Sequence, residues 1–71
     1  MRKTLRELRL ERGMTQSDLA AAVGVTPKSV VYAERRYWRP RPKTMRLMAD
    51  ALGVEISDVA EFVAVIRDEA A

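Results

Sequence analysis

The chain has 71 residues, of which 48% are apolar and 32% are charged, and its formal net charge is +3. This length suits one small domain, so we interpret residues 1–71 as a single domain and expect no separate catalytic one. Because the sequence contains neither cysteine nor histidine, disulfides, thiolate nucleophiles, imidazole catalysis and the usual zinc ligands are excluded. We therefore expect a protein that is not an enzyme and that uses no metal or cofactor.

Positive charge is concentrated in the first two-thirds of the chain. Residues 1–46 contain 12 Lys or Arg against 4 Asp or Glu, whereas residues 47–71 contain 1 against 6. A basic segment beside an acidic one favours a surface for a polyanion such as nucleic acid, although ordinary solvated helix faces produce the same asymmetry. No apolar run approaches membrane-spanning length and no signal peptide is recognisable, so we expect a cytoplasmic protein without membrane contact.

The apolar periodicity predicts an all-α domain, because no segment alternates apolar and polar residues as a half-buried strand does. A first helix is expected over about residues 2–12, ended by Gly13. A second helix begins after Thr15, whose spacing to Asp18 is typical of a capping box. This helix ends at Gly24, which supplies the positive φ that an abrupt change of direction requires.

A third helix begins at Thr26 and Pro27, which are favoured at the cap and at the first helical position, and it is expected to reach about Arg36. Val30 and Ala33 lie three residues apart and predict the buried side of this helix. The opposite side then presents a mixed set of side chains to solvent or to a ligand: Lys28, Val31, Tyr32 and Arg35.

The segment 35–43 contains two prolines and dense positive charge, which predicts an extended basic connector. Within it, Trp38 either seals the connector onto the core or lies along a sugar-phosphate backbone. A fourth helix is predicted from about Pro42 to Leu52. A fifth helix, over residues 57–69, is predicted from the cap Ser57 and from an apolar stripe of Val59, Phe62, Val63 and Ile66.

The second and third predicted helices form the most informative unit of the sequence. Two helices joined by a short turn cross steeply only if the residue at their contact is small, as Ala20 is, and if the turn contains a glycine, as Gly24 does. Such a crossing projects the third helix outward, and an α-helix has about the right size to enter the major groove of B-DNA. The spacing therefore indicates a helix-turn-helix.

The sequence resembles the Cro-like phage-repressor family, also called the xenobiotic-response-element family of helix-turn-helix regulators. The resemblance covers about residues 4–62. It implies a lambda-repressor-like fold, a compact domain of five helices in which the second and third bind double-stranded DNA. The motifs that carry it are Leu5-Arg6-Glu7-Leu8-Arg9, Arg12-Gly13-Met14-Thr15-Gln16, Leu19-Ala20, Val23-Gly24-Val25-Thr26, Glu34 and Met48-Ala49-Asp50-Ala51-Leu52-Gly53-Val54.

The resemblance also implies roles for single residues. The positions that read bases in relatives are occupied here by Gln16, Thr26, Lys28, Ser29, Val31 and Tyr32. The positions that contact phosphates, or alternatively carry solvated loop charges, are Arg35, Arg36, Arg39, Arg41 and Lys43. Arg9 and Glu34 match a pair that is usually salt-bridged. Arg36 and Tyr37 stand where many relatives have a glycine that ends the third helix, and Tyr32 could instead pack on a neighbouring arginine.

Members of this family commonly read inverted repeats as two-fold dimers, so we expect a repressor that acts as a homodimer. Apolar residues on the fifth helix, Phe62, Val63 and Ile66, are the predicted dimer interface. The alternative is that they fold back onto the first helix, over Leu10. A rival function is an antitoxin or regulatory module that acts mainly by binding a protein partner. RNA binding is disfavoured because stacking aromatics on a sheet platform are absent.

Overall fold

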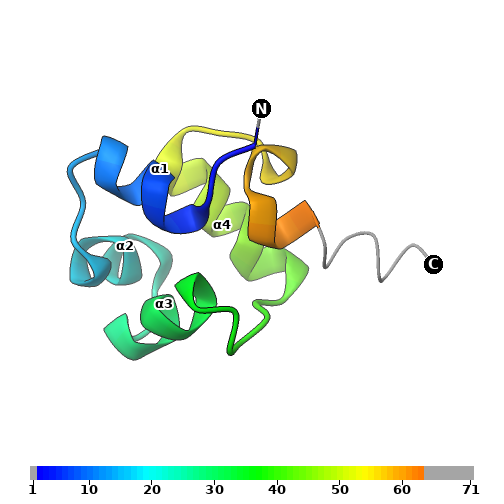
Figure 1. Ribbon diagram of the computed structural model, residues 1–71. Helices are drawn as coiled ribbons and strands as arrows, with labels where there is room; N and C mark the ends of the chain where they lie inside the picture. The colour runs from blue at the N-terminus through cyan, green and yellow to red at the C-terminus, as the bar shows by residue number, and fades with distance from the viewer. Residues whose placement is uncertain (1, 64–71) are drawn as a thin grey trace.

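The computed structural model describes residues 2–63, which form four α-helices and one 3-10 helix (Figure 1). The helices are α1 (Leu5–Glu11), α2 (Gln16–Val23), α3 (Pro27–Glu34), α4 (Pro42–Leu52) and the 3-10 helix η1 (Ile56–Asp58). A helical turn follows at residues 60–63. The described part of the chain contains no strand, and the predicted all-α helix-turn-helix architecture is confirmed. None of its helices has the length and apolar character needed to cross a bilayer.

Polar side chains fix where the first two helices begin. Thr4 caps α1, because its hydroxyl accepts from the backbone N–H of Glu7 and the Glu7 carboxylate accepts from the N–H of Thr4. Thr15 and Asp18 make the same reciprocal pair at α2, as predicted. The hydrogen bond from the Thr15 backbone N–H is the main cause that lowers the pKa of Asp18 below its usual value.

The first helix begins at Leu5 rather than near residue 2, because the chain before it pairs with a distant segment. The N–H of Lys3 donates to the carbonyl of Asp58 at 3.2 Å, and the carbonyl of Lys3 accepts from Ala60 at 2.9 Å. The carboxylate of Glu61 then accepts from the N–H of Leu5 at 3.0 and 3.2 Å, which satisfies a donor that a helix start leaves free. These contacts join the two ends of the described chain.

The hydrophobic core lies between the helices and includes residues from every predicted helix. Its side chains are nearly inaccessible to solvent, and Met14, Val23 and Trp38 pack against them from the edge. Burial of this kind is the main source of stability for so short a chain. The core consists of Leu5, Leu8, Leu19, Ala20, Val30, Ala33, Met45, Met48, Leu52, Val59 and Phe62.

The prediction that Phe62 lies in a dimer interface is wrong. Its side chain is 1% exposed and belongs to the core of the single chain, because the pairing of Lys3 with the segment around Val59 directs it inward. Phe62 packs within the chain, as the alternative prediction has it, but it does not cover Leu10, which is 53% exposed. Val63 is half-buried, and Ile66 lies outside the described residues.

The fifth helical segment also begins differently from the prediction. Ser57 lies inside η1 and does not cap a helix. Glu55 precedes η1 instead, and its N–H donates to the carboxylate of Asp58 at 3.0 Å. The helical turn that carries Phe62 starts at Ala60, after an extended residue at Val59. The bridge between Val59 and the N-terminal segment therefore interrupts the predicted helix, whose later part lies outside the described residues.

Helix α3 ends at Glu34 instead of Arg36, and its end contains a left-handed residue that is not glycine. Arg36 has φ +62°. Its N–H donates to the carbonyl of Ala33 at 3.1 Å, and the N–H of Tyr37 donates to the carbonyl of Tyr32 at 2.8 Å. These two hydrogen bonds are the Schellman arrangement, in which the left-handed position is usually glycine.

Replacing Arg36 by glycine is expected to stabilise the protein. A side chain in the left-handed region costs about 1–2 kcal/mol relative to glycine. Arg36→Ala is the matched control, because it removes the same charge but keeps the steric cost. We expect Arg36→Gly to unfold at a higher Tm than Arg36→Ala, by roughly 4–8 °C for each kcal/mol of that cost, in a thermal melt followed by circular dichroism. Equal Tm values for the two variants would contradict this account of the helix end.

Candidate nucleic-acid interface

The turn between α2 and α3 has the geometry that the sequence predicts. Gly24 ends α2 with φ +84°, and its N–H and that of Val25 donate to the carbonyl of Ala20 at 2.8 and 3.0 Å. Ala20 is 1% exposed and lies in the core cluster. Thr26 then caps α3 by accepting from the N–H of Ser29. The two helices thus change direction within three residues, and α3 lies at the bottom edge of Figure 1.

Helix α3 is anchored by one side and exposes the other. Val30 is fully buried and Ala33 is 3% exposed, which fixes the rotation of the helix about its axis. Lys28 is exposed, as predicted for a side chain that reaches a ligand, and Tyr32 is 39% exposed. Val31 is half-buried and lines a groove beside α1.

Two of the predicted reading residues also hold the start of α3. The hydroxyls of Thr26 and Ser29 share a hydrogen bond of 2.9 Å, and the Thr26 hydroxyl also accepts from the backbone N–H of Ser29. Removal of Thr26 therefore affects the helix cap, which is typically worth about 1 kcal/mol, as well as any contact to a ligand.

On the outer side of α3, Tyr32 contacts both Lys28 of the same helix and Tyr37 of the connector. The Lys28 ammonium lies 5.7 Å from the centroid of the Tyr32 ring, within the range of a cation–π contact. The Tyr37 ring centroid lies 6.3 Å from that of Tyr32, with a tilt of 57° between the rings. The aromatic neighbour of Tyr32 is thus Tyr37, a residue that the sequence pattern does not assign to the site.

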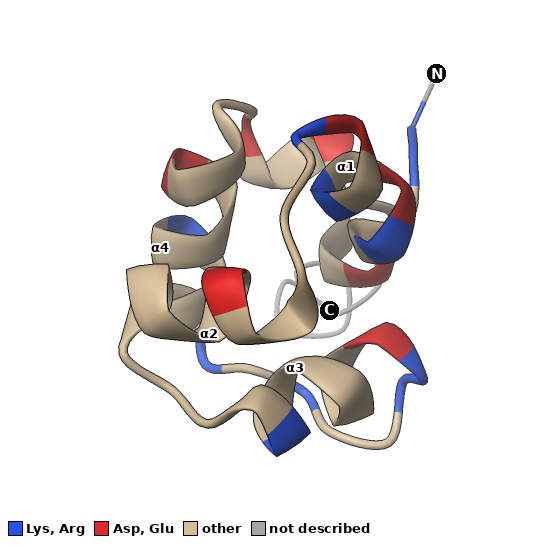
Figure 2. Ribbon diagram, turned by 90° about the vertical axis from the view of Figure 1, so that its left-hand side faces the viewer, with Lys and Arg blue, Asp and Glu red and all other residues tan. Residues whose placement is uncertain are grey.

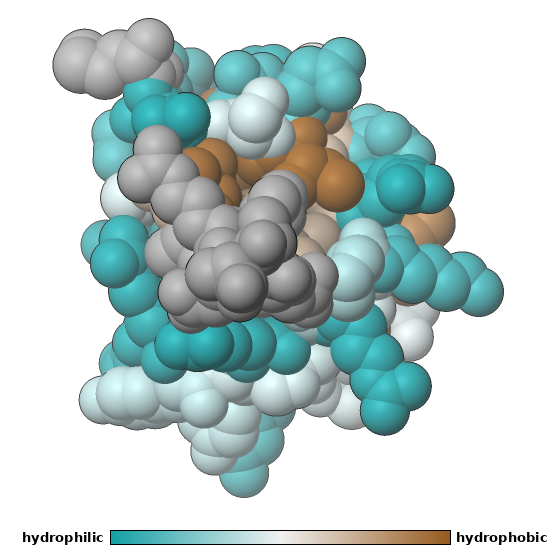
Figure 3. Space-filling model, turned by 90° about the vertical axis from the view of Figure 1, so that its right-hand side faces the viewer, coloured by the Kyte–Doolittle hydropathy of each residue, from teal (hydrophilic) through white to brown (hydrophobic). Residues whose placement is uncertain are grey.

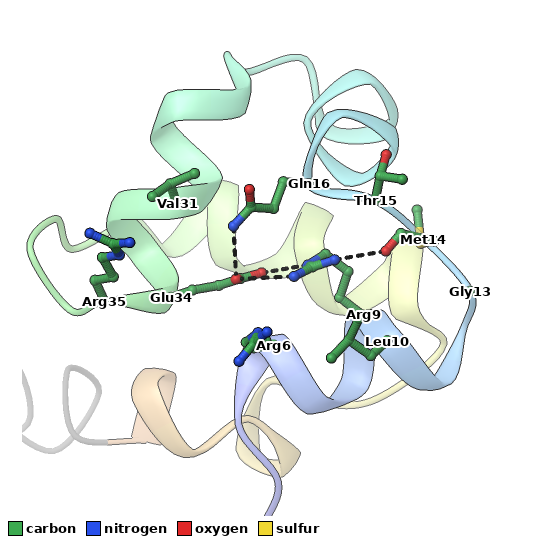
Figure 4. A pocket seen from close by; sticks show the side chains of 10 residues that line it. All are labelled: Arg6, Arg9, Leu10, Gly13, Met14, Thr15, Gln16, Val31, Glu34 and Arg35. Carbon is green, nitrogen blue, oxygen red and sulfur yellow. Dashed lines mark hydrogen bonds and ion pairs between the residues drawn. The ribbon is translucent and has the colours of Figure 1, made fainter.

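A groove of about 900 Å³ separates α3 from α1 and the start of α2 (Figure 4). At its base the guanidinium of Arg9 binds the carboxylate of Glu34 at 2.6 Å, and both side chains are less than 8% exposed. Arg9 also donates to the carbonyl of Met14 at 2.8 Å, and the Gln16 amide donates to Glu34 at 3.2 Å. The predicted salt bridge is confirmed, and the same carboxylate holds Gln16 in place.

The connector places its basic residues beside α3. Arg35 caps the end of α3 and Arg41 precedes α4, whose first turn carries Lys43, and these three side chains are exposed. Arg36 and Arg39, the two other predicted phosphate contacts, are exposed in the connector itself.

Two roles are predicted for Trp38: it either seals the connector onto the core or lies along a sugar-phosphate backbone. It packs against the core beside the buried Pro40, so the interpretation in which it seals the connector is confirmed. The basic residues around it are held near α3 because the chain between them is fixed to the core.

Among residues 2–63, the acidic residues other than Glu34 belong to segments outside α3, as the colours of Figure 2 show. The acidic residue of α3 itself, Glu34, is neutralised by Arg9. Among residues 2–63, Lys28, Arg35 and Arg36 form no ion pair. These three side chains therefore carry uncompensated positive charge at the exposed side and the end of α3.

The family comparison agrees with this geometry. Residues 5–59 match the model of a helix-turn-helix family, which covers α1 to η1. The chain belongs to this helix-turn-helix family. The resemblance to Cro-like, xenobiotic-response-element regulators is thereby confirmed, and the family is one of regulators rather than of enzymes.

Similar proteins come from archaea and bacteria. The chain is 40% identical over 60 residues to an uncharacterized HTH-type transcriptional regulator of Methanothermobacter thermautotrophicus, covering 83% of this chain and 87% of that protein. It is 34% identical over 62 residues to another from Archaeoglobus fulgidus, covering 87% and 89%. The crystal structure of the clp gene regulator ClgR from Corynebacterium glutamicum superimposes with a TM-score of 0.75 at 28% identity, covering 93% of this chain and 71% of that one.

Proposed function

We propose that this protein binds double-stranded DNA in a sequence-specific manner, with α3 in the major groove, and represses transcription. The observation that carries the proposal is the exposed side of α3, which presents Lys28 and Tyr32 while Val30 and Ala33 anchor the helix in the core. A rigidly held helix of this kind can place a few side chains on base edges in the groove.

The proposed interface makes two kinds of contact, to base edges and to phosphates. Lys28 can donate to the acceptors of guanine, Val31 can contact a thymine methyl, and the polar tip of Tyr32 can reach a base edge. The basic residues of the connector and of the α4 start, Arg35, Arg36, Arg39, Arg41 and Lys43, contact phosphates on either side of the groove. Phosphate contacts position the protein on the duplex but carry no sequence information directly.

Repression through a dimer on an inverted repeat forms the second part of the proposal. One α3 helix has eight residues, which offers too few base contacts for tight specific binding by a single copy. Val63 is half-buried at the end of the described chain, and Figure 3 shows hydrophobic surface exposed among hydrophilic side chains on that face. Because Phe62 lies in the core, the dimer contacts that we propose are Val63 and Ile66.

Selection of bound duplexes from a random library tests this function. We expect enrichment of a short motif that is repeated in inverted orientation, with half-sites about one helical turn apart. The affinity for the enriched duplex should fall steeply with salt, with a slope of log affinity against log salt of roughly 0.9 per phosphate neutralised. A selection that enriches no motif would refute sequence-specific binding, and a motif without repetition would refute the dimer.

Substitutions at Lys28 and Arg41 should separate base reading from phosphate binding. Lys28→Ala is expected to change the preferred base at one position, with a loss of about 1–3 kcal/mol of discrimination there. Arg41→Ala, the control of equal charge change, should weaken binding to all sequences alike and reduce the salt slope by about 0.9. Both effects are measured as affinities for a set of single-base variants of the enriched duplex. Equal losses on every duplex for both variants would contradict the division of roles.

A further inference from the structure

Tyr37 is the most exposed large apolar side chain among residues 2–63, at 74%. It follows the left-handed Arg36, and its N–H donates to the carbonyl of Tyr32, so its backbone is held against the end of α3. Because the ring stays exposed, it gains little stabilisation from burial in the free protein. Exposed apolar surface rimmed by charged residues marks interaction sites.

We propose that Tyr37 is a further DNA contact, in which the ring lies against a deoxyribose and the hydroxyl donates to a phosphate oxygen at the edge of the major groove. The inference rests on the proposed function and adds a residue that neither the sequence pattern nor the family motifs assign. Together with Lys28 and Tyr32, Tyr37 forms a continuous surface that we call the tyrosine strip.

The order of the groups along the tyrosine strip, with Tyr32 between Lys28 and Tyr37, indicates which part of DNA Tyr37 reaches. Lys28 lies 5.7 Å from the Tyr32 ring, and the Tyr37 ring lies 6.3 Å from Tyr32. The three groups therefore extend over no more than about the width of the major groove, ~12 Å. With Lys28 on base edges inside the groove, Tyr37 lies at the groove's rim, where sugars and phosphates face the protein.

The charges around Tyr37 favour DNA over a protein partner. Arg35 and Arg36 precede it directly, both are exposed, and neither forms an ion pair among the described residues. A ring beside two unpaired guanidinium groups is suited to a polyanion, since the arginines and the phenol hydroxyl all donate hydrogen bonds to phosphate. The left-handed Arg36 is the strained position that turns Tyr37 toward Tyr32, and such strain is concentrated at functional sites.

The test uses the whole protein and the duplex enriched by the selection above. Tyr37→Ala is expected to weaken binding by about tenfold, the loss of one good contact. Because the phenol is neutral, the salt slope should stay unchanged, in contrast to Arg41→Ala. Tyr37→Phe separates the hydroxyl from the ring, and Leu47→Ala, at an exposed apolar residue of α4, is the control for loss of exposed apolar surface.

Methylphosphonate substitution of single phosphates locates the contact. At one phosphate in each half-site, the substitution should weaken wild-type binding but leave the affinity of Tyr37→Phe unchanged, as expected when the two partners of one hydrogen bond are removed in turn. Thermal melts check that the variants are folded, which the exposure of Tyr37 leads us to expect.

The outcomes distinguish this inference from the function on which it rests. If the wild type enriches a motif but Tyr37→Ala binds it within about twofold of the wild type, only the role of Tyr37 is refuted. A change in oligomeric state, without a loss per DNA-bound copy, would identify a protein contact and also overturn the inference. A wild type that enriches no motif overturns both proposals.

Discussion

Replacing Glu34 by alanine is expected to destabilise the protein by about 3–5 kcal/mol. The substitution leaves the Arg9 guanidinium buried without its carboxylate partner, from which it lies 2.6 Å, and releases the Gln16 amide. A domain of this size rarely has more than about 3–5 kcal/mol of stability, so the variant should be largely unfolded in urea titrations followed by circular dichroism. Loss of DNA binding by this variant would then reflect unfolding rather than a lost contact.

An exposed ion pair between the N-terminal segment and the end of α1 supplies the matched control. Lys3 and Glu11 are 2.8 Å apart, but their side chains are 49% and 42% exposed, so Glu11→Ala should cost less than about 1 kcal/mol. A double variant, Arg9→Met with Glu34→Leu, should recover most of the loss, because it removes both buried charges together. If Glu34→Ala were no more harmful than Glu11→Ala, the pair would not be a buried support of α3.

Replacing Phe62 by alanine is expected to cost about 3–5 kcal/mol as well, because it leaves a cavity in the core. The side chain is 1% exposed and packs with Leu5, Val59 and the other core residues. The loss should be independent of protein concentration, since Phe62 stabilises the single chain. A residue whose main contacts were in a dimer would instead give a loss that varies with concentration.

Two further variants make the result for Phe62 decisive. Leu10→Ala, at a side chain that is 53% exposed, should change stability by no more than about 0.5 kcal/mol. Phe62→Leu keeps most of the apolar volume and should give a smaller loss, so that its unfolding can be followed even where the alanine variant is unfolded. A concentration-dependent loss for Phe62→Leu would contradict the position of Phe62 in the core.

Local chemistry explains why much of the fold was predictable. Thr15, Thr26 and Gly24 act through hydrogen bonds and backbone angles within a few residues, so their roles at the ends of α2 and α3 are the same in the sequence and in the structure. The inward positions Val30 and Ala33 follow from helical periodicity in the same way. These features already define which side of α3 is exposed.

The sequence by itself thus determined the helix-turn-helix and the charge of its exposed side. Only the tertiary structure decided how distant segments meet. The pairing of Lys3 with the segment around Val59 buries Phe62, and the left-handed Arg36 ends α3 early and places Tyr37 beside Tyr32. The physical reason is range: caps and periodicity depend on neighbours within one or two helical turns, whereas these contacts depend on how the whole core packs.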